Sequence, residues 1–132
     1  MKSMIRIIGE NEKGTPPEAF ESKTDLVSRL FSKDGFLQST LGLEHRPQQE
    51  AMAVEVCQAI QKDESLLFEA GTGVGKSLAY LLPSIIFAME AQRPCIVATH
   101  TIALQEQLLR KDLPLCRSLF EQTSALSSYQ GF

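Results

Sequence analysis

The residues best suited to chemistry lie in the stretch FEAGTGVGKSLAYLLP, from Phe68 to Pro83. Gly75, Lys76 and Ser77 match the end of the phosphate-loop pattern G-x-x-x-x-G-K-[ST], but Ala70 stands where its first glycine would be. In such a loop, glycines turn backbone N–H groups toward phosphate, the lysine reaches the β- and γ-phosphates, and the hydroxyl ligates Mg²⁺. The pattern therefore predicts a nucleotide site made of Ala70, Gly71, Thr72, Gly73, Val74, Gly75, Lys76 and Ser77.

The surrounding pattern decides between a phosphate loop and a glycine-rich turn with an incidental lysine. The apolar run SLLFEAG precedes the loop, and GKSLAYLLPSIIFAMEA follows it, which is long enough for a helix kinked or ended near Pro83. A second apolar run, PCIVATH, leads into a second amphipathic stretch, TIALQEQLLRKD. Strand, helix, strand, helix at these lengths predicts an α/β fold with a parallel sheet and crossover helices, with both chemically interesting segments at the carboxyl ends of strands.

Two further helices are predicted ahead of the loop. In TDLVSRLF, Thr24 is the expected N-cap of a helix whose apolar residues recur at helical spacing: Leu26, Val27, Leu30 and Phe31. In RPQQEAMAVEVCQAIQKDE, Pro47 suits a first helical turn. One face of that second helix should be buried, because apolar residues recur at i, i+3, i+4 and i+7: Ala53, Val56, Cys57 and Ile60.

Composition limits the functions that fit. The chain has 132 residues and a net charge of −3, which gives no general support for nucleic-acid binding, so any contact with a polyanion would be local, with Arg110, Lys111 and Arg117 as candidates. The longest apolar run, residues 78–89, is shorter than a bilayer span, so a cytoplasmic protein without a membrane partner is expected. Three widely spaced cysteines suit neither a disulfide framework nor a metal site, and we interpret them as small core residues.

Three blocks of the chain together resemble a known family. The blocks EHRPQQEAMAVEVCQAI, FEAGTGVGKSLAYLLP and VATHTIALQEQLLRKDLP are similar, in order and spacing, to the start of the first motor domain of DinG-type, XPD-like superfamily 2 ATP-dependent DNA helicases. The resemblance covers Leu26 to Leu119. It implies a partial RecA-like P-loop NTPase domain that uses ATP and Mg²⁺ and contacts single-stranded DNA weakly.

The resemblance also implies roles for residues outside the loop. The family's Arg-Pro-x-Gln element, which helps to hold the adenine, falls on Arg46 and Gln49; a solvated helix start is the alternative interpretation. The family's next motif runs over single-stranded DNA, and it falls on Thr99, His100, Thr101 and Gln105. The alternative there is that Thr101 caps a helix and His100 is an incidental loop residue.

Several parts of such helicases do not appear in this sequence. Family members continue with four iron–sulfur cysteines, an Asp-Glu-x-His box and a second motor domain, so the cluster is expected only in full-length relatives. We therefore expect a truncated or frame-shifted helicase fragment, not active alone, with a leader or linker at 1–23, motor-domain sequence at 24–119 and a non-native or disordered tail at 120–132. Two alternatives stay open: an unrelated phosphate-loop enzyme such as a small-molecule kinase, and a non-catalytic nucleotide-binding remnant. The sequence does not indicate an oligomeric state.

Overall fold

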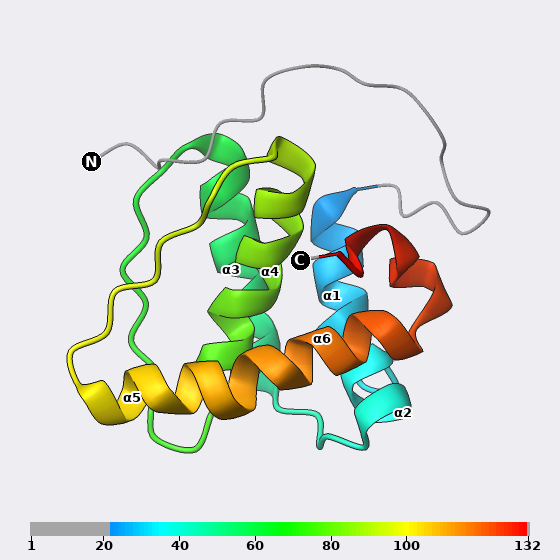
Figure 1. The fold of residues 1–132 in the computed structure, drawn as a ribbon, viewed down its shortest axis with the longest axis horizontal. Helices are drawn as coiled ribbons and strands as arrows, with labels where there is room; N and C mark the ends of the chain where they lie inside the picture. Colours follow the sequence, from blue (N-terminus) through cyan, green and yellow to red (C-terminus); the bar gives the residue numbers. More distant parts are fainter. Residues whose placement is uncertain (1–21, 132) are drawn as a thin grey trace.

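The computed structural model describes residues 22–131, which form a set of packed helices (Figure 1). In chain order the elements are α1 (Lys23–Phe31), α2 (Phe36–Leu41), α3 (Pro47–Lys62), α4 (Lys76–Ala91), α5 (Ile102–Gln107), the π-helical η1 (Leu108–Asp112), α6 (Leu113–Gln122) and the 3₁₀-helical η2 (Ser124–Tyr129). Most of the leader predicted at 1–23 lies outside the described residues. Among the described residues, no helix has the length and apolar character needed to cross a membrane.

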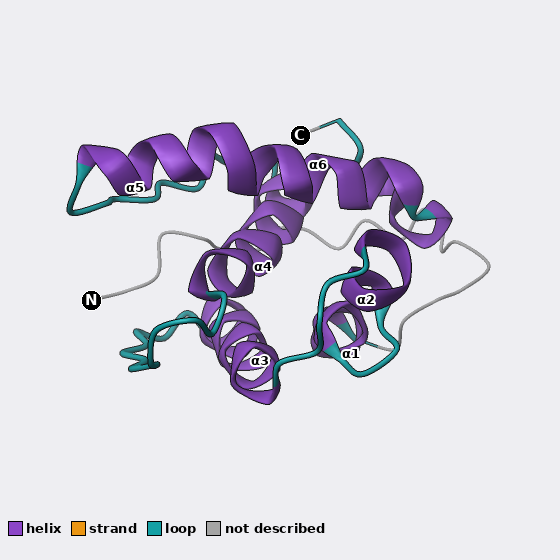
Figure 2. Cartoon of the chain, turned by 90° about the horizontal axis from the view of Figure 1, so that it is seen from below, coloured by secondary structure: helices purple, strands orange, loops and turns teal. Residues whose placement is uncertain are grey.

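Helices α3 and α4 form the centre of the molecule, and α1 packs against α3 (Figures 1 and 2). Helices α5, η1 and α6 continue one another as a long rod that crosses the end of this group (Figure 2). The core between them is apolar, and its largest fully buried side chains include Leu30, Leu82, Ile86, Phe87, Leu119 and Phe120. Helix α4 is buried along most of its length, which fixes the position of the loop at its N-terminus.

The predicted parallel sheet is wrong for this structure, because none of the described residues belongs to a β-strand. The two apolar runs expected to be strands cross the surface as extended segments, 64–71 and 93–99 (Figure 1). Most of their side chains stay exposed, with Leu67 at 98% and Ile96 at 77%, while Phe68 is half-buried against the core. A strand needs a hydrogen-bonding partner, and a parallel sheet needs cover on both faces. Here α3 and α4 pack directly on each other. The described residues therefore form a helical fold, and not the expected α/β, RecA-like fold with a parallel sheet and crossover helices.

The predicted helices are present, with corrected ends. All four apolar residues expected to be buried on α1 are buried, but Ser22 and not Thr24 is its N-cap, since the Ser22 hydroxyl accepts from the Asp25 N–H at 3.1 Å. Pro47 opens α3 as predicted. Helix α4 continues through Pro83 to Ala91 and does not end there. Cys57 and Cys116 are core residues, and burial raises the pKa of the Cys116 thiol to about 12, but Cys95 is exposed, which corrects its interpretation as a core residue.

The C-terminal residues pack against the rest of the described chain. Leu126 of η2 is fully buried, and the Tyr129 hydroxyl donates to Glu90 of α4 at 2.7 Å. Burial, together with the hydrogen bond to Glu90, raises the pKa of Tyr129 well above its ordinary value. The other Glu90 oxygen pairs with Lys23 at 2.8 Å. Glu90 therefore joins the start of α1 to η2, while the domain boundary placed after residue 119 stays a prediction.

Candidate nucleotide-binding site

The predicted phosphate loop enters α4 through two glycines in the left-handed backbone region. Gly73 has φ +77° and Gly75, the N-cap of α4, has φ +81°. Glycine adopts these values without the clash that a Cβ would cause. No side chain caps α4, so the first-turn N–H groups of a 16-residue helix lack a capping partner from a side chain. A helix start of this kind favours an anion.

The remaining loop residues fit the same use. Lys76 is exposed and has no ion-pair or hydrogen-bond partner for its ammonium among residues 22–131, and Ser77 is half-buried in the first turn of α4. A Cβ added to Gly71 or Gly73 would meet open space, so the loop leaves room beside its backbone. Ala70 is not among the residues with positive φ. The departure from the first glycine of the pattern therefore introduces no backbone strain.

Arg46 and Gln49 meet the loop from the start of α3. Arg46 Nη1 donates to the Gly73 carbonyl oxygen, and Gln49 Nε2 donates to the Gly75 carbonyl oxygen at 3.0 Å. Gln49 is 7% exposed, so its carboxamide is held inside the structure and is not part of a solvated helix start. A Cβ built on Gly75 would overlap Gln49 Nε2. The structure thus brings the two residues predicted to hold a base against the loop predicted to hold phosphate.

A pair of side chains that the sequence analysis did not single out anchors this end of α3. His45 Nε2 lies 2.7 Å from Glu50 Oε2, and the Ser28 hydroxyl donates to the other Glu50 oxygen at 3.4 Å. These contacts tie the turn before Arg46 to α1. A histidine five residues before a glutamate is too common a pattern to have revealed them, because the contact with Ser28 depends on the packing of α1 against α3.

The four residues predicted to contact DNA lie at the start of α5. The Thr101 hydroxyl caps that helix by accepting from the Leu104 N–H at 3.1 Å, as its alternative interpretation predicts. The Thr99 hydroxyl donates to the Thr101 carbonyl oxygen at 3.2 Å. His100 and Gln105 are exposed. Both threonine hydroxyls thus have partners inside the turn, and the contact of these residues with DNA stays a prediction.

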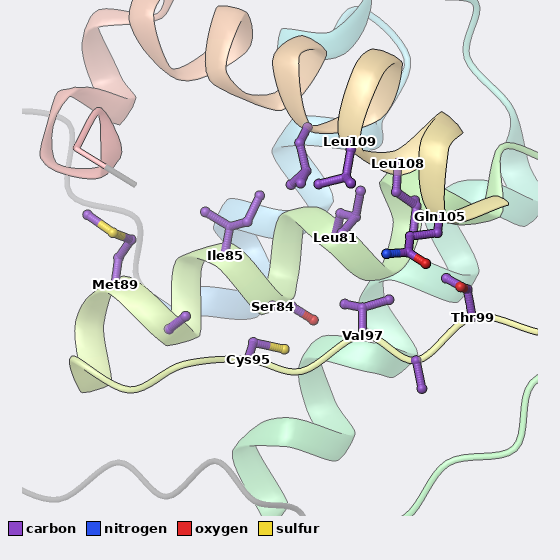
Figure 3. Close-up of a pocket in the computed structure, with 13 residues that line it drawn as sticks. Leu81, Ser84, Ile85, Met89, Cys95, Val97, Thr99, Gln105, Leu108 and Leu109 are labelled. Atoms are coloured by element: carbon purple, nitrogen blue, oxygen red, sulfur yellow. The ribbon is translucent and has the colours of Figure 1, made fainter. Parts of the chain in front are cut away.

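A separate cavity of about 580 Å³ lies between α4, residues 95–99 and the α5–η1 rod (Figure 3). Leu81, Ile85, Val97, Leu108 and Leu109 give it an apolar lining, while Thr99 and Gln105 stand at one end. None of residues 70–77 lines it, and neither does any charged side chain. An apolar cavity without cations is unsuited to a triphosphate, so the phosphate loop and not this cavity is the candidate nucleotide site.

Comparison with known protein families supports the resemblance that the order of the sequence motifs indicates. Residues 46–129 match the family described as DEAD/DEAH box helicase, which is more than half of the chain. The chain belongs to the DEAD/DEAH box helicase family. The predicted phosphate loop, the Arg46–Gln49 element and the start of α5 all fall inside the matched residues.

The chain is also similar in sequence to individual proteins of known name. The chain is 50% identical over 76 residues to the ATP-dependent helicase DinG of Mycobacterium tuberculosis, covering 58% of the chain and 11% of the relative. It is 40% identical over 102 residues to the ATP-dependent DNA helicase YoaA of Escherichia coli, covering 76% and 15%. It is 42% identical over 79 residues to the 3'-5' exonuclease DinG of Bacillus subtilis, covering 60% and 8%. The chain thus spans a small part of these relatives, and no solved structure matches it.

Proposed function

We propose that this chain is the nucleotide-binding part of an ATP-dependent DNA helicase and that it binds ATP with Mg²⁺ at residues 70–77. The observation that carries the proposal is the start of α4, which follows two positive-φ glycines and has no side-chain cap within residues 22–131. The exposed Lys76 ammonium beside it has no partner in that same part of the chain. The helix start and the lysine together offer positive charge to a triphosphate. Two of the relatives above are named as ATP-dependent helicases, which supports ATP as the nucleotide.

The residues present also fit Mg²⁺. A hard divalent cation prefers oxygen ligands, and the half-buried Ser77 hydroxyl supplies one at the first turn of α4. When bound, the ion neutralises charge on the β- and γ-phosphate oxygens. Lys76 would hold the same oxygens from the solvent side, while the loop N–H groups orient them.

DNA contact belongs to the proposal through Thr99, His100, Thr101 and Gln105. Because the threonine hydroxyls already bond within the turn, contact with phosphate would fall on backbone N–H groups and on the exposed His100 and Gln105 side chains. The contact should be weak, since few phosphates would be neutralised by a chain of net charge −3. Family membership argues against the small-molecule kinase alternative.

The test of nucleotide binding is a titration of a fluorescent ATP analogue with Mg²⁺ into the chain and into Lys76→Ala. Losing a charged hydrogen bond to phosphate removes about 1.5–3 kcal/mol, so affinity should fall by at least about tenfold. Lys62→Ala, at the exposed end of α3, is the matched control and should bind as the unaltered chain does. Equal binding by the Lys76 variant and the unaltered chain would contradict the phosphate-loop assignment.

A further inference from the structure

Arg46 and Gln49 contact the phosphate loop only through backbone carbonyl oxygens, those of Gly73 and Gly75. Both acceptors belong to the positive-φ glycines that shape the loop. In a trans peptide, the C=O and the following N–H point in opposite directions across one rigid plane. A donor that fixes the Gly73 carbonyl therefore also fixes the Val74 N–H, and a donor that fixes the Gly75 carbonyl fixes the Lys76 N–H.

We propose that Arg46 and Gln49 are positioning residues that aim the Val74 and Lys76 N–H groups at the phosphates by holding the opposite ends of the same two peptide planes. The inference rests on the proposed nucleotide binding. Arg46 is the N-cap of α3 and Gln49 lies in its first turn, so the two carbonyls turn toward the start of α3. The two N–H groups therefore turn away from α3, toward the open side of the loop where Gly71 and Gly73 leave space.

The role differs from holding a base. A residue that reads the adenine affects ligands that carry adenine and leaves a bare triphosphate untouched. A residue that sets the loop affects both alike, because the phosphates are common to them. Gln49 is buried, and its carboxamide already donates to the Gly75 carbonyl oxygen. Gln49 approaches Gly75 so closely that no side chain would fit at position 75. These contacts favour the loop-setting role.

The first measurement compares Mg-ATP with Mg-tripolyphosphate by isothermal calorimetry on the full chain and on Arg46→Ala and Gln49→Ala. The neutral hydrogen bond of Gln49 corresponds to about a threefold to tenfold change in affinity, and that of the charged Arg46 guanidinium to about tenfold or more. Each variant should lose its factor of affinity for both ligands. Gln48 is the exposed neighbour on α3, so Gln48→Ala is the matched control and should keep its affinity for both ligands. Loss for ATP alone, or loss for neither ligand, would overturn the inference; an unaltered chain that binds neither ligand overturns the proposed function itself.

The second measurement separates positioning from general loss of structure. In amide NMR spectra of the unaltered chain, tripolyphosphate should shift both the Val74 and the Lys76 resonances. Arg46→Ala should abolish the shift at Val74 and keep it at Lys76, and Gln49→Ala should do the reverse. Arg46→Lys, which keeps a donor, should restore part of the Val74 shift, while Gln49→Glu, which keeps the shape and loses the donor, should behave as Gln49→Ala. Identical effects of all variants on both amides would overturn the assignment.

Discussion

At the scale of single residues, Gly75 carries two constraints at once. Its φ of +81° excludes a Cβ without strain, and the space that a Cβ would fill is taken by Gln49 Nε2. The loop pattern in the sequence predicts the first constraint, because the glycines of such a loop stand where the backbone adopts positive φ. It does not predict the second, because Gln49 lies 26 residues earlier in the chain and meets the loop only after α3 and α4 pack.

We expect Gly75→Ala to weaken Mg-ATP binding by at least about tenfold. An alanine at this positive φ is strained, and its Cβ overlaps Gln49, so both the Gly75 carbonyl and the Gln49 side chain must move. The matched control is Gly42→Ala at the end of α2, where φ is +68° but nothing lies within 4 Å of an added Cβ. Both variants should lose about 1 kcal/mol of unfolding free energy through backbone strain. Nucleotide titration and urea unfolding give both quantities, and an equal loss of affinity in Gly42→Ala would show that the effect is not local.

At the scale of elements, the sequence predicts helices well and strands poorly. The 3.6-residue spacing of Leu26, Val27, Leu30 and Phe31 identifies the buried face of α1, because a helix makes its hydrogen bonds within itself. The runs at 64–71 and 93–99 have strand-like composition, but a strand depends on partners elsewhere in the chain, and the described residues provide none. The η1 π-helix was also not predicted; it lies just before Pro114, which has no N–H to donate.

The η2 element supplies a direct test of whether the C-terminal segment is part of the fold. Leu126 is fully buried, so Leu126→Ala should cost about 2–5 kcal/mol of unfolding free energy through lost apolar contact and a residual cavity. Ser128→Ala, exposed two residues later, should change it by less than about 0.5 kcal/mol. Urea unfolding followed by circular dichroism measures both. Equal stability of the two variants would support a tail that does not belong to the fold.

At the scale of the whole molecule, apolar surface and charge are distributed unevenly. Large apolar side chains stay exposed on the two extended segments and along the α5–η1 rod: Leu66, Leu67, Ile96, Val97, Ile102 and Leu109. Extended backbone beside exposed apolar side chains favours pairing with another chain. The net charge of −3 opposes this only weakly. We therefore expect the isolated chain to self-associate as its concentration rises.

Substituting Leu67→Lys and Ile96→Lys together should suppress that association, because two of the most exposed apolar side chains are replaced by charges. Helix packing should be unaffected, since neither side chain contributes to the core. Gln58→Lys with Ser128→Lys is the matched control, as it changes the net charge from −3 to −1 in the same way at exposed polar positions. Sedimentation velocity over a concentration series measures the association. If the control variant suppressed it equally, charge would be the cause; if the first variant left it unchanged, the contact would lie on another face, with Ile102 and Leu109 of the α5–η1 rod as the next residues to substitute.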